Sequence, residues 1–204
     1  MYDDTLAFMG TRNISGDTTG DFQHAISDLQ TIRLRPELRL TEVPTPGHMA
    51  LYLIAMFAKV LGAPVASDTE LPSGRFVALH DPSFSEPWEG SWRIVTFARA
   101  VMEAETATDP MLGEVGWNWL TDSLTEVGAQ FRVTVGTVTR VISEGYSALS
   151  DNISTVALEV RASWTPSGLD LGTYLSAWIN LLCTIADLPP LPEGWWPCRV
   201  SVDE

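Results

Sequence analysis

The sequence predicts an α+β fold, with an antiparallel sheet of about five strands and three to four helices packed mainly on one face. Strand-like runs follow one another through short loops, which favours antiparallel pairing. Helical periodicity occurs near the start, in the middle and near the end, so helices and strands do not alternate along the chain. Hydrophobic residues make up 45% of the 204 residues, which is enough for one core without a stabilising metal or disulfide framework.

We expect a disordered segment over residues 1–18, a single α+β domain over residues 19–188 and an irregular tail over residues 189–204. The first segment is rich in Gly, Thr and Asp, and the tail is rich in Pro and Trp. The opening residues are acidic and lack the basic and apolar regions of a signal peptide. The longest apolar run is too short to span a bilayer. These features predict a cytoplasmic protein.

In the first half of the domain, apolar spacing predicts a helix over residues 20–33, and a short extended run follows over residues 38–43. Residues 48–61 are ambiguous. Their helical spacing and few β-branched residues favour a helix slightly, but a short, continuously apolar run is also typical of a buried strand. Residues 74–80 and 91–102 are predicted strands, and the second is expected to be central because both of its faces carry apolar residues.

In the second half, a helix is predicted over residues 110–127, after an Asp-Pro pair and before a glycine. A long strand is predicted over residues 130–144. Its apolar positions change parity, and a β-bulge at Gly136 would explain the change. A cleanly alternating strand over residues 155–164 and an amphipathic helix over residues 169–187 complete the domain. The eight tryptophans are expected mainly to pack the core and its rim, with an aromatic recognition surface as the alternative.

The net charge of −14 and the pI near 4.4 limit the partners. Such a charge repels phosphate backbones and anionic membranes, so we expect neither nucleic-acid nor membrane binding. Solubility explains such a charge, and a basic partner is the functional alternative. The partner we expect is another protein or a second copy of the chain. Three dispersed histidines and two cysteines lack the spacing of a metal site, and no phosphate-binding glycine motif is present. We therefore expect no metal and no cofactor.

The hairpin over residues 74–101 contains the candidate site, because it concentrates charged and aromatic groups that must be paired or exposed. Tryptophan and arginine dominate binding hot spots, and Trp88 belongs to a turn that should reach the surface. The adjacent His80 and Asp81 resemble two members of a catalytic triad, but a turn is the favoured interpretation because triads are spatial and no nucleophile elbow is present. No catalytic residue is assigned. The candidate binding residues are Arg75, His80, Asp81, Trp88, Glu89, Arg93 and Arg99.

Arginines recur throughout the predicted strands. One interpretation is cross-strand ion pairing on an exposed face, which contributes little for each pair. The functional interpretation is an arginine-lined groove for an acidic group. An arginine cluster with too few carboxylates nearby would favour the groove. The strand arginines are Arg75, Arg93, Arg99, Arg132, Arg140 and Arg161.

Several segments, among them RPELRLTEVPTP, GRFVALHDP, WEGSWRIVTFARA and LEVRASWTP, carry a resemblance to a known family. In these segments the chain resembles an actinobacterial family known as the domain of unknown function number three thousand, over roughly residues 20–193. The resemblance implies an actinobacterial cytoplasmic protein and supplies no activity, since the family has none assigned. If residues 48–61 are a strand, the element order also looks like the secretion-chaperone fold, whose small acidic dimers bind unfolded segments of partner proteins. The extra run over residues 38–43 and the long tail depart from that fold.

We expect a non-enzymatic protein-binding module of the adaptor or chaperone kind. The alternative is an enzyme that acts on a small molecule at the hairpin over residues 74–101. An enzyme should have a deep pocket with convergent polar groups. An adaptor should have a broad, shallow apolar or aromatic surface.

Overall fold

The computed structural model describes residues 18–29, 32–44, 52–63, 70–103, 106, 109–144 and 154–189. Apart from Thr18 and Pro189, the expected disordered segment and irregular tail lie outside these ranges. The described elements, in chain order, are α1 (Thr18–Leu29), β1 (Leu38–Glu42), β2 (Tyr52–Val60), β3 (Ser73–Ser85), the short 3₁₀ helix η1 (Glu86–Trp88), β4 (Gly90–Met102), α3 (Leu112–Glu126), β5 (Phe131–Glu144), β6 (Ser154–Pro166) and α4 (Leu171–Ile185).

The predicted α+β class with an antiparallel sheet is confirmed, but the sheet has six strands where about five were expected. Its strand order is β1-β2-β3-β4-β6-β5, and every neighbouring pair is antiparallel. The slight preference for a helix over residues 48–61 was wrong, because Tyr52–Val60 is strand β2. This strand lies between β1 and β3 and is apolar on both faces, so its sequence lacks the polar alternation of a half-exposed strand.

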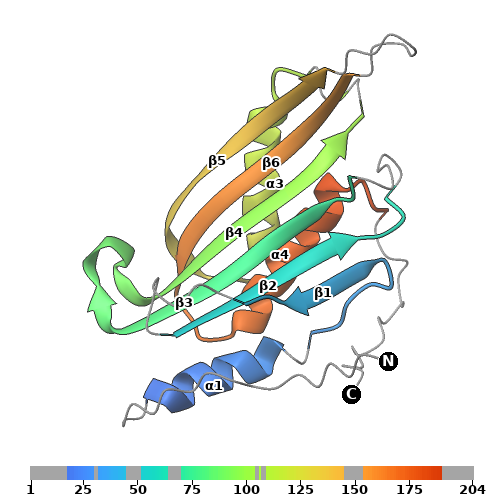
Figure 1. Ribbon diagram of the computed structural model, residues 1–204. Helices are drawn as coiled ribbons and strands as arrows, with labels where there is room; N and C mark the ends of the chain where they lie inside the picture. Colours follow the sequence, from blue (N-terminus) through green and yellow to red (C-terminus); the bar gives the residue numbers. More distant parts are fainter. Residues whose placement is uncertain are drawn as a thin grey trace, which may run out of the picture.

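The sheet has one face covered by helices. In Figure 1, α3 and α4 lie behind the sheet, and α1 lies near one end of it. Side chains alternate between this helix face and the opposite face, which we call the open face because none of the α-helices in the described ranges packs on it. The helix face of β4 shows the burial this produces: Ile94 and Ala98 are 0% exposed. The core therefore lies between the sheet and the two helices.

Helix α4 is the centre of this core, since most of its residues are buried. It begins after Asp170, whose carboxylate accepts a hydrogen bond from the Thr173 amide at 3.2 Å, as an N-cap does. The indole N–H of Trp178 donates to the Phe97 carbonyl across the interface, at 3.1 Å. A Cβ at Gly74 would lie 2.7 Å from the Trp178 ring, so a glycine lets the helix approach β3 closely.

The parity change in β5 is real, but its predicted position was wrong. The register shift lies between Arg132 and Val135, and Gly136 is an ordinary paired residue opposite Ala162. The shift places Val135 on the open face, where it is 55% exposed. Glycine at 136 has another cause: a Cβ there would lie 2.3 Å from the Arg161 carbonyl oxygen and 2.6 Å from the Trp117 ring.

The described tryptophans lie mostly in or beside the core. Trp92, Trp164 and Trp178 are at most 5% exposed. Trp117 and Trp119 are partly buried and pack against the same cluster. Core packing therefore accounts for these five residues, whereas Trp195 and Trp196 lie outside the described residues.

Candidate binding face

The open face concentrates positive charge in a chain whose net charge is −14. The strand register places seven of the twelve lysine and arginine residues on this face, and Glu159 is the one carboxylate among the described, register-paired strand residues that share it. Only the pairing of strands reveals this segregation, because these cations come from six different strands. They are Arg39, Lys59, Arg75, Arg93, Arg99, Arg132 and Arg161.

Two neighbouring rows of side chains cross the open face. The first, which we call the charged row, alternates aromatic rings and guanidinium groups from β2 to β6: Phe57, Arg75, Phe97 and Arg161. The guanidinium of Arg161 lies over the Phe97 ring, 5.2 Å from its centroid, which is a cation–π contact. The second, which we call the apolar row, lies two residues away along the strands and consists of Ala55, Val77, Val95, Ser163 and Val135.

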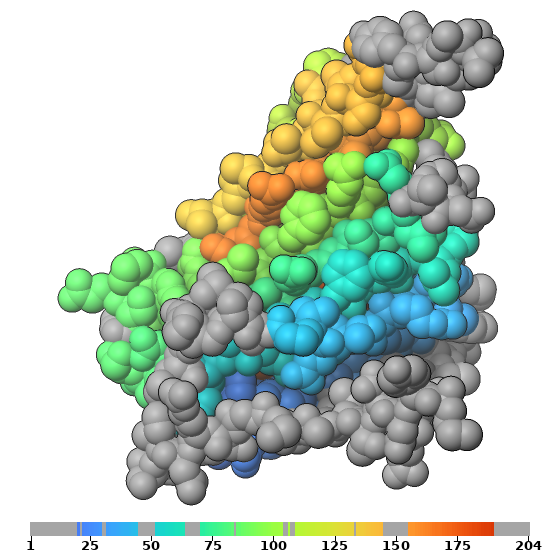
Figure 2. Space-filling view, viewed as in Figure 1, coloured from blue at the N-terminus to red at the C-terminus, as the bar shows by residue number. Residues whose placement is uncertain are grey.

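A shallow groove of about 320 Å³ lies over the part of these two rows that runs from β3 to β5. Arg75 and Arg161 contribute to its lining, together with the apolar side chains of Val77, Val95, Phe97 and Val135. Two of these residues are unusually exposed for valine, at 38% for Val95 and 55% for Val135. Figure 2 views the open face, on which the strands that form the groove run diagonally across the molecule.

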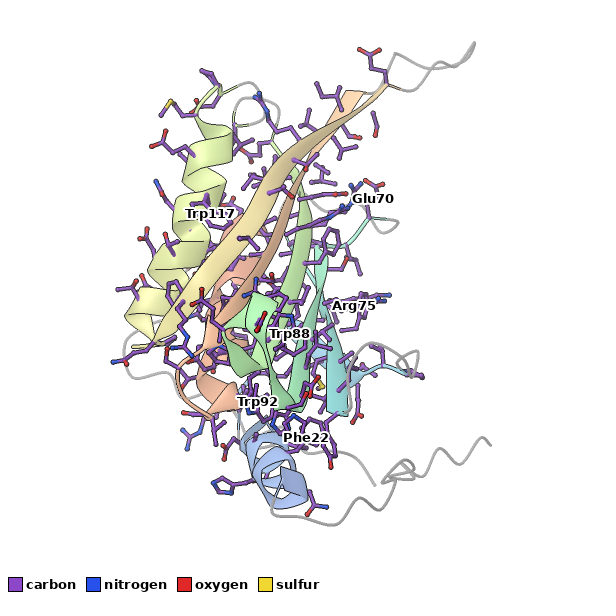
Figure 3. The ribbon with its side chains drawn as sticks, turned by 90° about the vertical axis from the view of Figure 1, so that its left-hand side faces the viewer. Phe22, Glu70, Arg75, Trp88, Trp92 and Trp117 are labelled. Carbon is purple, nitrogen blue, oxygen red and sulfur yellow. The ribbon has the colours of Figure 1, made fainter. Side chains whose placement is uncertain are left out.

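The carboxylates near this face are shared among the arginines. Glu159 pairs with Arg99 at 3.0 Å and with Arg161 at 2.8 Å, and Arg99 also lies 3.6 Å from Glu70. Arg75 is exposed and has no hydrogen-bond or ion-pair partner among the described residues. In Figure 3 its side chain extends away from the sheet, on the side opposite Trp117 and α3. Cations therefore outnumber carboxylates on the open face. This excess is the condition that favours an arginine-lined groove over simple ion pairing.

His80 does not face this groove. It is 4% exposed on the helix side of the sheet, where its ring stacks on Trp92 with centroids 4.3 Å apart and lies near Phe22 and Tyr52. Figure 3 shows Phe22 of α1 beside Trp92 at this end of the sheet. These rings attach α1 to the sheet, so the environment of His80 is that of a core aromatic side chain.

Asp81 follows His80 at the point where the register of β3 and β4 shifts. Its carboxylate accepts hydrogen bonds from the Ser83 hydroxyl at 2.6 Å and the Ser83 amide at 2.9 Å. These two bonds hold the pKa of Asp81 below its usual value, because they stabilise the charged form. The geometry is that of an Asx turn.

The tip of the β3–β4 hairpin is anchored to neighbouring strands. The carbonyl of Trp88, a half-buried residue of η1, accepts a hydrogen bond from the Thr165 hydroxyl. Glu89 adopts the left-handed conformation with φ of 51°, and its carbonyl accepts a hydrogen bond from Arg132 at 2.6 Å. The tip therefore has a fixed place against β5 and β6.

Arg93 lies in the open-face register but is only 7% exposed. It donates hydrogen bonds to the Ser163 hydroxyl at 2.6 Å and the Thr165 hydroxyl at 3.2 Å. Burial lowers its pKa, because loss of water disfavours the guanidinium charge. Arg93 therefore supports the hairpin tip, and Arg75 is the more accessible cation.

The candidate residues chosen from the sequence do not converge on one site. Arg75, Arg93 and Arg99 share the open face, whereas His80 lies on the opposite side of the sheet. Of the remaining strand arginines, Arg140 lies on the helix side and donates to the Asp109 carbonyl at 3.1 Å. Four groove residues were missed as site residues, because their alternation along each strand was visible but their cross-strand register was not. They are Val77, Val95, Phe97 and Val135.

A comparison with protein families gives one match: the model described as "Protein of unknown function (DUF3000)" matches residues 18–194. No curated protein and no solved structure matches the chain. Within the described residues, no helix combines the length and the apolar character needed to cross a membrane.

Proposed function

Because the chain belongs to the DUF3000 family, whose function is unknown, we propose from its geometry that it is a non-enzymatic protein-binding module that uses the open face. One observation carries the proposal: an acidic chain leaves one sheet face without a helix in the described ranges and collects cations and apolar side chains there. Contiguous exposed apolar surface on a domain marks interaction sites. A positive patch additionally favours partners of opposite charge.

The order of elements gives a second, weaker argument. With β1 set aside, the chain runs helix, three strands, helix, two strands, helix. This is the order that resembles the secretion chaperones, and it supports an adaptor or chaperone role by analogy of topology alone. We place this role in the cytoplasm, with a protein or a second copy of the chain as partner and no nucleic acid.

The enzyme alternative has less support. It requires a pocket in which polar groups converge. The groove on the open face has a mainly apolar lining, and His80 lies on the opposite side of the sheet from Arg75. No specific observation within the described ranges favours a reaction at the hairpin.

Site-directed photo-cross-linking tests the proposal. A photo-reactive amino acid replaces Val95 or Val135 on the open face, or Met111 as a matched position that is 52% exposed at the start of α3. Each variant is irradiated in an extract of the source organism. We expect the same discrete cross-linked protein from both open-face positions and a much weaker product from Met111. Equal products at all three positions, or none at Val95 and Val135, would contradict the proposal.

A further inference from the structure

We propose that the groove on the open face binds an extended protein segment in which carboxylate and apolar side chains alternate. This inference rests on the proposed function and specifies the chemistry of the partner. It follows from the parallel arrangement of the charged row and the apolar row, which lie side by side across four strands of the sheet.

The charged row selects carboxylates. Arg75 and Arg161 flank Phe97 on neighbouring strands, so their backbones lie two strand spacings, or about 10 Å, apart. Guanidinium groups bind carboxylates through paired hydrogen bonds, and the planar ring between them leaves an apolar floor. Arg75 has no partner among the described residues, and Arg161 shares Glu159 with Arg99. Both arginines can therefore pair with a further carboxylate.

The apolar row selects aliphatic side chains. Val77, Val95 and Val135 lie about 7 Å from the charged row, the distance between residues i and i+2 of a strand. Val95 and Val135 are more exposed than their apolar character favours. A ligand that covers them removes this surface from water, which stabilises the complex.

An extended chain that lies between the two rows meets both requirements. Its side chains point alternately to opposite sides. With its backbone parallel to the rows, one set reaches the arginines and the other set reaches the valines. The groove spans β3, β4, β6 and β5, three strand spacings or about 14 Å, which corresponds to about four residues of extended chain.

The open form of the groove favours a protein segment over a small molecule. A pocket for a small ligand encloses most of the ligand surface. Here the lining residues all belong to strands of the one sheet, with no wall from a described helix. A segment that lies flat on this face buries one side and leaves the other in water, as a docked peptide does.

Fluorescence anisotropy with defined peptides provides the test. The probe is a labelled peptide that alternates glutamate and leucine, added to the full-length protein at low ionic strength. Three control peptides separate the requirements: one alternates lysine and leucine, one alternates glutamate and serine, and one contains the same glutamates and leucines in two separate blocks. We expect the alternating glutamate–leucine peptide to bind most tightly, with an affinity that falls as salt is added.

Arginine variants locate the binding. Arg75→Gln and Arg161→Gln remove one cation each from the groove, and Arg140→Gln removes an exposed cation from the helix side of β5 as a control. We expect each groove variant to weaken binding about fivefold, the effect of one exposed charge pair, and the control to leave affinity unchanged. Circular dichroism melts verify that all three variants remain folded.

Three outcomes would overturn the inference: equal binding of all four peptides, equal effects of the three arginine variants, or no binding of any peptide. Tighter binding of a labelled single-stranded uridine oligonucleotide, with the same dependence on Arg75 and Arg161, would overturn it in favour of a stacking surface for nucleic acid. If peptides fail but cross-linking through Val95 and Val135 still identifies a partner, the proposed function stands and the partner chemistry is wrong.

Discussion

The two faces of the sheet are built from the same strands but have different physical characters. On β4, Ile94 and Ala98 face the helices and are fully buried, whereas Val95 between them is 38% exposed. The helix face carries most of the closely packed apolar core, and the open face carries cations, rings and valines in register. Alternation thus lets one strand stabilise the fold with one side chain and offer a binding group with the next. Substitutions should divide accordingly between stability and recognition.

The largest difference between the faces should come from truncating the core tryptophan of α4. Trp178 is 0% exposed, so Trp178→Ala removes a large ring and leaves a cavity. We expect a loss of about 3–5 kcal/mol in the free energy of unfolding, measured by denaturant titration. Val95→Ala on the open face should cost less than about 1 kcal/mol. Similar losses for both variants would mean that the open face is also packed as a core.

A second pair of variants adds atoms instead of removing them. Gly136→Val inserts a side chain where the Cβ alone would lie 2.3 Å from the Arg161 carbonyl oxygen, so we expect destabilisation of about 1–3 kcal/mol. At Gly113 of α3, a Cβ would have no heavy atom within 4 Å apart from its chain neighbours and the backbone of its own helix, so Gly113→Ala should be neutral or stabilising by up to about 1 kcal/mol. Thermal melts that leave Gly136→Val unchanged would refute the close approach of β5, β6 and Trp117.

The pH dependence of stability tests the burial of Cys183 in α4. Burial raises the pKa of this thiol to about 11, with Arg35 lowering it and Glu37 raising it. In the unfolded chain a cysteine ionises near pH 8.5. The folded state therefore holds the proton more tightly, and the stability that the thiol contributes is present below about pH 8.5 and lost as the pH rises towards 11.

Two variants isolate this thiol: Cys198→Ser keeps Cys183, and Cys183→Ala/Cys198→Ser lacks it. Between pH 8 and pH 10, we expect the free energy of unfolding to fall by about 1–2 kcal/mol more in the variant that keeps Cys183. Tyr174, whose pKa burial also raises, is present in both proteins, so its titration cancels to a first approximation. Equal pH profiles for the two variants would show that the thiol is accessible to water. Denaturant titrations at each pH supply the free energies.

The smallest effects on stability should come from the charges of the open face. Arg75→Gln removes an exposed cation that has no partner among the described residues, so the free energy of unfolding should change by less than about 0.5 kcal/mol. Glu159→Gln disrupts pairs with Arg99 and Arg161 and should cost up to about 1 kcal/mol. If Arg75→Gln lowers the free energy of unfolding more than Glu159→Gln does, then Arg75 stabilises the fold and its proposed role in binding is contradicted.

Much of the fold could be predicted from periodicity. Helices α3 and α4 and strands β4, β5 and β6 lie within about two residues of their expected ranges, because the spacing of their apolar residues distinguishes helix from strand. Residues 52–60 were misjudged because a strand apolar on both faces has no polar alternation to distinguish it from a short buried helix. The parity change in β5 was detected, but its position was not, because Gly136 is constrained by a packing contact with Trp117 that the sequence does not reveal.

The candidate site was predicted less well than the fold. Arg75 and Arg161 were recognised as strand arginines, yet the sequence could not show that they flank Phe97. That arrangement depends on the register of three strands, and the order β4-β6-β5 brings β6 beside β4 across the intervening α3 and β5 segments of the chain. His80 and Asp81 were chosen as candidates because of their residue types, although the ring of His80 is buried in the core.

The recovery of a partner by charge-reversed variants tests the central claim most directly. Arg75→Glu/Arg161→Glu reverses two cations of the groove, and the control Arg140→Glu reverses an exposed cation on the helix side of the sheet. For each variant, the amount of recovered partner, identified beforehand by cross-linking, is divided by the amount of folded variant used to capture it. We predict loss of the partner with the double variant and unchanged recovery with Arg140→Glu. Equal recovery with both would contradict the claim that the open face is the binding face.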